Sequence, residues 1–355
     1  MIAWAAVLPY VVIFAIVVTG PPSWSAIGYV ASVGLVIIGL LTQPNEWGEA
    51  RRPRGLTRGA LAAIVVVALV RGFTGNEGES LRLETSGYRT VFASRFVNRL
   101  VDESDVAVAS TRLMVGAGMV RDDDDELPDA MRAGYARMRD AEGDAPSPML
   151  ATFLGMQKLA KHDVVIVQPR GRVPNREIDE RRTAIVFLGD SNNFALPCWQ
   201  AAQAVADLDV ITACPSLRRD ANWSSAEGEA IVRHTVDVLR QRGIARLILM
   251  GKSNGAIGAS RLAPKMRGVF EGLVLVSGVA HDAGAPGVPT LVLHGSRDTL
   301  ASATLARQYA LRHRGTYFPL RAGHHAMLVR ADEHDRALKA FMSERVARPV
   351  ARASL

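Results

Sequence analysis

A serine flanked by glycines directly follows a short apolar run in the C-terminal half of the chain. Leu247 to Met250 has the composition of a buried strand, and Gly251-Lys-Ser-Asn-Gly255 comes next. A tight turn from strand to helix needs neighbours without side chains on both sides of Ser253, and the two glycines supply them. Such a turn would present the hydroxyl beside the first N–H groups of a helix. The pentapeptide alone also fits a glycine-rich turn with a solvent-facing serine, so the rest of the chain must decide.

The N-terminal part of the chain is apolar and uncharged as far as Glu46. Ile2 to Thr19 and Trp24 to Thr42 are apolar runs close to the roughly 20 residues that cross a membrane as a helix. Gly20 to Ser23 predicts a tight turn, so we expect a helical hairpin. A cleaved signal peptide would begin with a basic segment, which Met1 to Tyr10 lacks.

A third apolar run, Gly59 to Val70, lies between two arginines. Extended from Leu56 to Phe73, it could cross a membrane if both arginines reach the interface. Arginines crowd the preceding segment, which should therefore stay cytoplasmic; they are Arg51, Arg52, Arg54 and Arg58. We expect three spans, which place the following chain outside the cytoplasmic membrane, whereas two spans would leave it inside.

The remaining chain divides near residue 162. Residues 1–73 are expected to form a membrane anchor of two to three helices, and residues 74–161 a partly helical accessory region that includes a helix over Met149 to Lys161. From His162 onward, apolar strands alternate with helical patterns, which predicts an α/β fold with a mainly parallel, doubly wound sheet over residues 162–355. The expected strands are Val164–Val167, Ala184–Leu188, Val210–Ala213, Leu247–Met250, Leu273–Val276, Thr290–Leu293 and Gly315–Leu320. Active sites in such sheets lie at the carboxyl ends of the strands, where Ser253 would be.

A serine nucleophile needs a base, and the base needs an orienting acid. His324 follows Gly323 on the segment after the last expected strand and is the chosen base, with His325 as the alternative. Asp298 lies just past another apolar strand and is the chosen acid, although it could merely cap the next helix. Ser253, Asp298 and His324 each follow a strand, in the order Ser, Asp, His.

These three motifs carry a resemblance to the α/β-hydrolases over roughly half of the chain. Gly251 to Gly255 matches the nucleophile elbow of that family, Leu293 to Asp298 its acid loop, and Gly323-His324 its histidine loop. The resemblance implies an esterase- or lipase-like serine hydrolase with an acyl-enzyme intermediate, no metal and no organic cofactor. Ser253 would attack an acyl carbonyl, His324 would transfer the proton, and Asp298 would orient the imidazole.

The segment expected to complete the oxyanion hole departs from the family pattern. Many members carry His-Gly after the strand before the first core helix, whereas this chain has Gly189-Asp-Ser191. The backbone N–H of Asn254 should be one donor, and the second should come from Asp190 or Ser191. Gly189-Asp-Ser191 also resembles the first block of the GDS-type esterases, with Ser191 as nucleophile, but no Asp-x-x-His follows it. A further alternative is an inactive hydrolase scaffold that acts as a binding protein.

Charge and cysteine content limit the partners. The net charge of +7 is scattered rather than gathered into a basic stripe, which argues against nucleic acid. The cysteines are Cys198 and Cys214, without zinc-ligand spacing. Both should lie at the carboxyl end of the sheet, within the about 7 Å between Cα atoms that a disulfide requires. A disulfide there would favour an extracytoplasmic catalytic domain. Only a short loop separates Ser277 from Val288, where many relatives insert a lid. We therefore expect an open site for a small-molecule or lipid ester, unless residues 74–161 fold over it.

Overall fold

The computed structural model describes residues 22–42, 55–74, 78–85, 96–120, 126–169, 182–190 and 192–346, together with helical positions 7, 10, 11 and 14. Within these residues an eight-stranded sheet has the order β1-β2-β4-β3-β5-β6-β7-β8. Its strands are β1 (Leu81–Thr85), β2 (Asp163–Val167), β3 (Thr183–Leu188), β4 (Ile211–Pro215), β5 (Arg246–Lys252), β6 (Gly272–Val276), β7 (Thr290–Gly295) and β8 (Thr316–Leu320). Strand β2 runs antiparallel to β1 and β4, and all the other pairs are parallel. The predicted α/β fold with a mainly parallel sheet is confirmed.

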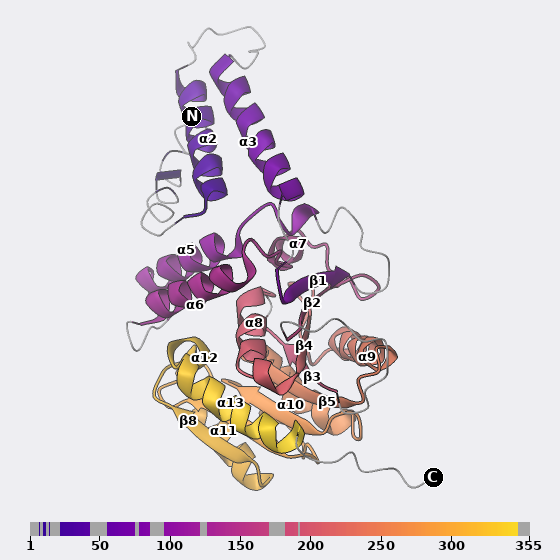
Figure 1. Cartoon of the computed structure of the whole chain (residues 1–355). Coiled ribbons are helices and arrows are strands. Elements are labelled where there is room, and N and C mark those ends of the chain that lie inside the picture. The colour runs from indigo at the N-terminus through magenta and orange to yellow at the C-terminus, as the bar shows by residue number, and fades with distance from the viewer. Residues whose placement is uncertain are drawn as a thin grey trace.

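Helices cover both faces of the sheet (Figure 1). One face packs against α8 (Ala195–Gln203), α12 (Ala326–Val329) and α13 (Ala331–Val346), and the other against α9 (Ala226–Gln241), α10 (Asn254–Lys265) and α11 (Ala303–Arg312). Every residue of the central strand β5 is buried. This explains why the sequence shows continuous apolar runs here and no alternation of apolar with polar residues, since a strand covered on both faces has no solvent side.

Two long apolar helices project from one end of the molecule (Figure 1). They are α2 (Trp24–Leu41) and α3 (Gly55–Thr74), and by length and composition both could cross a membrane. Helix α3 has 20 residues and extends past both arginines that flank its apolar centre. The expected run from Leu56 to Phe73 is therefore helical throughout. The first predicted span, 2–19, lies largely outside the described residues.

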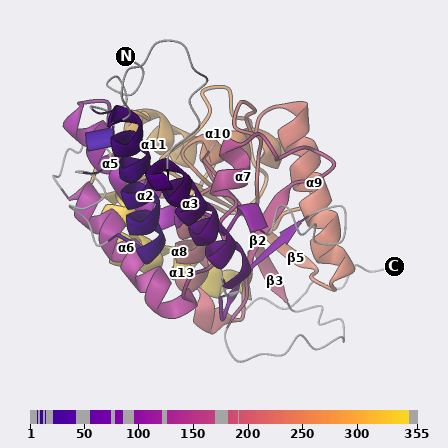
Figure 2. The ribbon, with the colours of Figure 1, turned by 90° about the horizontal axis from the view of Figure 1, so that it is seen from above.

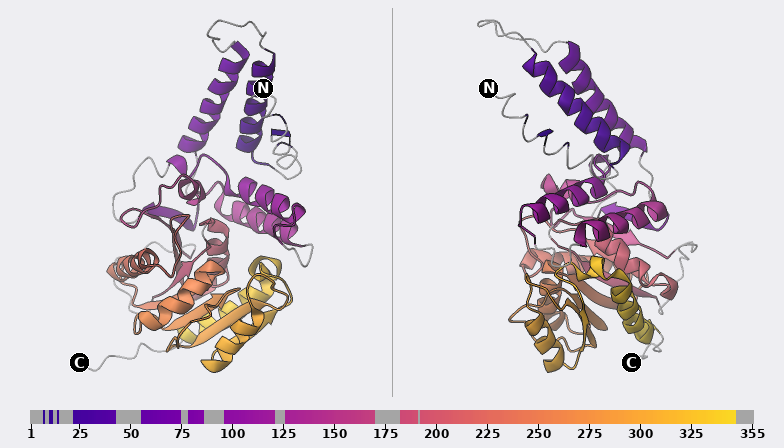
Figure 3. Two further views of the ribbon diagram at one scale, coloured as in Figure 1. Left: turned by 180° about the vertical axis from the view of Figure 1, so that it is seen from behind. Right: turned by 90° about the vertical axis from the view of Figure 1, so that its left-hand side faces the viewer.

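Two helices of the accessory region lie between this hairpin and the sheet (Figures 1 and 3). They are α5 (Glu103–Gly116) and α6 (Leu127–Glu142), and the short α7 (Met149–Phe153) leads towards β2. A view onto the hairpin shows α2 and α3 over the side that carries α5 and α6, with α9 towards the other side (Figure 2). The expected helix from Met149 to Lys161 is wrong beyond Phe153, because Gly155 has φ +69° and turns the chain.

Strand β1 was not expected from the sequence. It pairs with β2 and extends the sheet by one strand on the N-terminal side of residue 162. Its five residues follow a polar, glycine-rich stretch and have no clear apolar alternation beyond Leu81 and Leu83, both buried. The division into an accessory region and a catalytic domain stays a prediction, but the sheet itself draws one strand from the accessory side.

Cys198 and Cys214 form a disulfide, with 6.2 Å between their Cα atoms. Cys198 lies in the first turns of α8, and Cys214 lies near the end of β4. The predicted proximity of the two cysteines is confirmed. The bond fastens the first core helix to the strand beneath it.

Reducing this disulfide should destabilise the chain. Cross-linking residues 16 apart removes conformational entropy from the unfolded chain, and a loop of this size contributes about 3 kcal/mol. Urea unfolding of the detergent-solubilised protein, followed by tryptophan fluorescence with and without a thiol reductant, measures the loss. The Cys198→Ser, Cys214→Ser double variant should match the reduced protein and ignore the reductant. Equal free energies of unfolding for the oxidised and reduced wild type would contradict the expectation.

Candidate active site

Ser253 lies on a strained turn between β5 and α10. Its backbone has φ 52° and ψ −117°, a conformation that a residue with a side chain rarely adopts. A Cβ on Gly251 would come within 2.3 Å of the Gly255 carbonyl oxygen. A Cβ on Gly255 would come within 1.8 Å of the Leu188 carbonyl oxygen. The glycines are therefore required by backbone packing, as the pentapeptide predicted.

The structure brings Ser253, His324 and Asp298 together. Ser253 Oγ lies 2.8 Å from His324 Nε2, and His324 Nδ1 lies 2.9 Å from Asp298 Oδ2. Because Nδ1 faces a carboxylate, it carries the ring proton, which leaves Nε2 as an acceptor for the serine hydroxyl. The acid and the base come from the segments that follow β7 and β8, at the same end of the sheet as the elbow. The arrangement is that of a nucleophile, a base and an orienting acid.

Asp298 both caps the next segment and binds His324. Its Oδ1 accepts the backbone N–H groups of Leu300 and Ala301, each at 2.9 Å, while Oδ2 faces the imidazole. The side chain is fully buried. Burial opposes ionisation, yet hydrogen bonds from two histidines and one amide outweigh it and hold the pKa of the Asp298 carboxyl below its ordinary value. The capping role and the candidate catalytic role are thus compatible in one side chain.

A second histidine on this carboxylate was missed in the sequence. His294, in β7, is fully buried, and its Nε2 lies 3.2 Å from Asp298 Oδ2 and 3.2 Å from the Ala301 carbonyl oxygen. Both neighbours are acceptors, so Nε2 carries the proton and donates it. The only signal in the sequence is its place four residues before the acid, which is also an ordinary strand position.

His325, the alternative base, lies edge-on to His324, with 5.4 Å between the ring centroids. Burial, followed by the nearby charge of Lys252, lowers the pKa of His325 to about 3. It is therefore neutral at ordinary pH. The imidazole that accepts the hydroxyl hydrogen of Ser253 is that of His324.

The candidate oxyanion donors are only partly described. Asn254 is the first residue of α10, so its backbone N–H has no acceptor within the helix. Asp190 lies just past β3, and its Oδ2 lies 3.4 Å from the Nζ of Lys252, a side chain only 4% exposed. The positive charge of Lys252 is therefore paired with the Asp190 carboxylate within the protein. Ser191 lies outside the described residues.

Metal ligation has no obvious place here. Over the described ranges, no group of three or more His, Cys, Asp or Glu side chains could hold a metal ion.

Comparisons with known proteins give matches to solved structures alone. No protein-family model matches the chain. No curated protein matches it either. The solved structures that match include α/β serine hydrolases and esterases that align with about half of this chain.

Three of these structures show the extent of the similarity. Est1E from Butyrivibrio proteoclasticus is 14% identical over 53% of this chain and 96% of its own, with a TM-score of 0.43. A serine hydrolase without lid from Xanthomonas campestris is 19% identical over 54% and 93%, with a TM-score of 0.44. An esterase from Pyrococcus furiosus is 14% identical over 52% and 87%, with a TM-score of 0.43. At such identities and scores, the roles of individual residues rest on the geometry of this chain.

His325 should make the protein sensitive to acid. The pKa of His325 is about 3 in the folded protein and roughly 6.5 in an unfolded chain. Between these two pH values the unfolded state binds a proton on His325 that the folded state does not. The free energy of unfolding should therefore fall as pH drops from about 6.5 towards 3, and His325→Gln should remove that part of the fall. Urea unfolding of both proteins at a series of pH values measures the difference. His281→Gln, at an exposed position, serves as the control. Parallel curves for wild type and His325→Gln would contradict the assignment.

Proposed function

We propose that the chain is a membrane-anchored serine hydrolase that cleaves an ester or related acyl bond through an acyl-enzyme intermediate. The observation that carries the proposal is the hydrogen-bonded series from Ser253 Oγ through His324 to the buried Asp298, with distances of 2.8 and 2.9 Å. A strained elbow that exposes the nucleophile adds to its support. A solvent-facing serine in an ordinary turn needs neither the strain nor a histidine at hydrogen-bonding distance.

The chemistry follows from these contacts. Ser253 Oγ attacks the acyl carbonyl carbon while His324 Nε2 takes its proton, and Asp298 stabilises the imidazolium that forms. The carbonyl oxygen becomes an oxyanion beside the N–H of Asn254 and a second donor from the Asp190–Ser191 segment. The intermediate collapses as His324 returns the proton to the leaving alcohol, amine or thiol. Water, deprotonated by the same imidazole, then releases the acid and regenerates the free serine.

A small-molecule or lipid ester is the proposed substrate class. The chain between β6 and β7 is short and contains neither helix nor strand in the described structure, so nothing inserted there covers the site as a lid. A hydrolase held at a membrane by apolar helices meets acyl groups that are themselves dissolved in or attached to that membrane.

We further propose that α2 and α3 cross the membrane and that the catalytic domain is extracytoplasmic. Both helices have the length and apolar content to cross. The arginine-rich segment between them favours a cytoplasmic connection, which sends the chain after α3 to the opposite side. The disulfide supports the same orientation, because such bonds persist in oxidising compartments.

Labelling with a fluorophosphonate probe tests the hydrolase proposal. The probe reacts with a serine whose base and oxyanion donors are in place, so membranes that contain the wild type should be labelled and those with Ser253→Ala should not. Asp298→Asn should label far more slowly, because loss of the orienting acid reduces such catalysis by about 10⁴. In-gel fluorescence of matched amounts of protein gives the comparison.

The other outcomes separate the alternatives. Label retained in Ser253→Ala would move the nucleophile elsewhere, with Ser191 as the next variant to make. A wild type that takes no label while its disulfide and unfolding transition are intact would indicate an inactive scaffold that serves in binding.

A single introduced thiol tests the orientation. Both cysteines of the chain are in the disulfide, so Leu311→Cys, at a position 67% exposed on α11, adds the only free thiol. A membrane-impermeant maleimide should label this variant on intact cells, and the wild type should stay unlabelled. Labelling that requires prior lysis of the cells would place the domain on the cytoplasmic side and overturn the proposed topology.

A further inference from the structure

The segment between β3 and α8, residues 189–194, is described except for Ser191, and different parts of the chain hold its two ends. We call it the oxyanion loop, since it includes Asp190 and Ser191. At its inner end the Gly189 carbonyl accepts the indole N–H of Trp223 at 2.8 Å, and Asp190 pairs with Lys252. These partners belong to the hydrolase part of the chain. The inner end of the loop is therefore fixed by the sheet and its neighbours.

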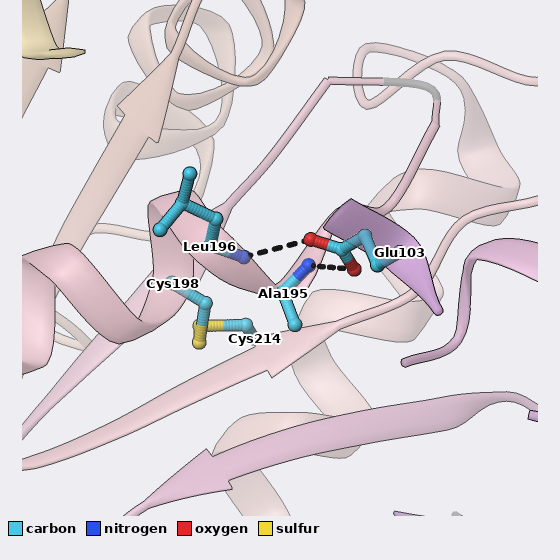
Figure 4. Close-up of a disulfide and its surroundings, with 5 residues drawn as sticks. All are labelled: Glu103, Ala195, Leu196, Cys198 and Cys214. Atoms are coloured by element: carbon cyan, nitrogen blue, oxygen red, sulfur yellow. Dashed lines mark hydrogen bonds between the residues drawn. A yellow bond between two sulfur atoms is a disulfide. The ribbon is translucent and has the colours of Figure 1, made fainter. Parts of the chain in front are cut away.

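The outer end of the loop is held from the accessory region. The carboxylate of Glu103, the first residue of α5, accepts the backbone N–H groups of Ala195 at 2.7 Å and Leu196 at 3.1 Å (Figure 4). These two residues begin α8, directly after the loop. Phe194, in the N-cap position of α8, makes no side-chain cap. Glu103 thus supplies, from about ninety residues earlier in the chain, the cap that the helix itself lacks.

Glu103 is itself held firmly in place. It is 5% exposed and also accepts the hydroxyl hydrogens of Tyr135 and Ser147, so four donors surround the carboxylate. Burial raises its pKa, and these hydrogen bonds work against the rise. A buried carboxylate with all its partners inside the protein costs a great deal to displace, because any movement leaves donors unpaired.

A second contact from the accessory region reaches the loop itself. Asn193 has φ 52°, and its Nδ2 donates to Thr152 Oγ1 of α7 at 3.0 Å and to the Leu217 carbonyl at 2.6 Å. Its Oδ1 accepts the N–H of Leu217 at 3.1 Å. The amide of one loop residue therefore joins the accessory region to the segment that follows β4.

We propose that the accessory helices α5 to α7 position the oxyanion loop, with Glu103 and Thr152 as the positioning residues. This inference rests on the proposed hydrolase function and gives the accessory region a role in catalysis. An oxyanion donor acts through its distance to the developing charge, and loss of one typically reduces the rate by about 10²–10³. If the outer end of the loop is released, the second oxyanion donor is misplaced. The transition state then loses stabilisation, which lowers kcat, while substrate binding stays largely unchanged.

Glu142 offers a matched control for Glu103. It is also a buried carboxylate of the accessory helices, and it accepts the backbone N–H groups of Ser80 and Leu81 and the indole N–H of Trp199. Glutamine at either position replaces one carboxylate oxygen, an acceptor, with an NH2 group. That NH2 group would face the N–H and O–H donors that now bind the carboxylate. Both variants should lose stability. Glu103 binds the first two amides of α8, whereas Glu142 contacts α8 at the Trp199 side chain, one turn further on, so only the change at Glu103 disturbs the first turn.

The kinetic test uses the full-length protein in detergent with a p-nitrophenyl acyl ester. Glu103→Gln should lower kcat about 10- to 100-fold with KM nearly unchanged, part of the loss expected for a missing donor, whereas Glu142→Gln should keep kcat near the wild-type value. Thr152→Val should lower kcat by a smaller factor, with Thr235→Val, a buried hydroxyl on α9, as its control. Equal changes of kcat in the two glutamine variants, or a change in KM alone, would overturn the proposal.

Amide hydrogen exchange of the same variants separates this inference from the proposed function. Glu103→Gln should speed exchange in peptides that span residues 189–196, and Glu142→Gln, whose contact with α8 is at Trp199, should not. If the wild type neither cleaves the ester nor takes the fluorophosphonate label, the proposed function fails, and the exchange data still decide whether Glu103 positions the loop. Unchanged exchange over 189–196 in Glu103→Gln would sink the positioning role whatever the activity. Should Glu103→Gln fail to fold, Thr152→Val carries both measurements.

Discussion

Close backbone packing around Ser253 is the constraint on which the site depends. The N–H of Ser253 donates to the Val276 carbonyl at 2.8 Å, so the turn is tied to β6. The Leu188 carbonyl, at the end of β3, lies where a Cβ of Gly255 would be. Strands β3, β5 and β6 thus all contact the turn that carries Ser253, and the hydrogen bonds between them hold a conformation that the residue would not adopt alone. The position of this turn sets where the His324 imidazole and the oxyanion loop must lie to reach the Ser253 hydroxyl.

The part of the chain from β2 onward was largely predictable because its signals are local. Strand β5 is covered on both faces and therefore shows an unbroken apolar run, and the glycines beside Ser253 are required by contacts within the turn. Asp298 follows another such run, β7, and His324 follows the edge strand β8. The disulfide could be predicted as well, since the parallel connection brings the ends of neighbouring strands together.

What escaped prediction depends on contacts between distant parts of the chain. Glu103 looks like any acid in the first turn of a helix, and nothing near it in the sequence points to the amides of Ala195 and Leu196. Strand β1 is five residues long and owes its conformation to its pairing with β2. His294 has an ordinary strand position, and its contact with Asp298 exists only because the chain turns back after β7. The partners of these residues are brought close only by the tertiary structure, and the hydrophobic periodicity of the sequence gives no information about such contacts.

The base of the hairpin is attached to the accessory region through both of its helices. The backbone and hydroxyl of Ser23, at the start of α2, donate to the carboxylate of Asp105. Arg71, in the last turn of α3, is 5% exposed and pairs with Asp144 at 2.8 Å. Two attachments at separate points restrict rotation of the domain about the hairpin more than one would. If α2 and α3 are embedded in a bilayer, the serine is held at one height and one tilt above the lipid surface. If Ser253 cleaves acyl bonds as proposed, the distance of each bond from the lipid surface would then help to select the substrate. Only bonds that extend to the height of Ser253 could be attacked.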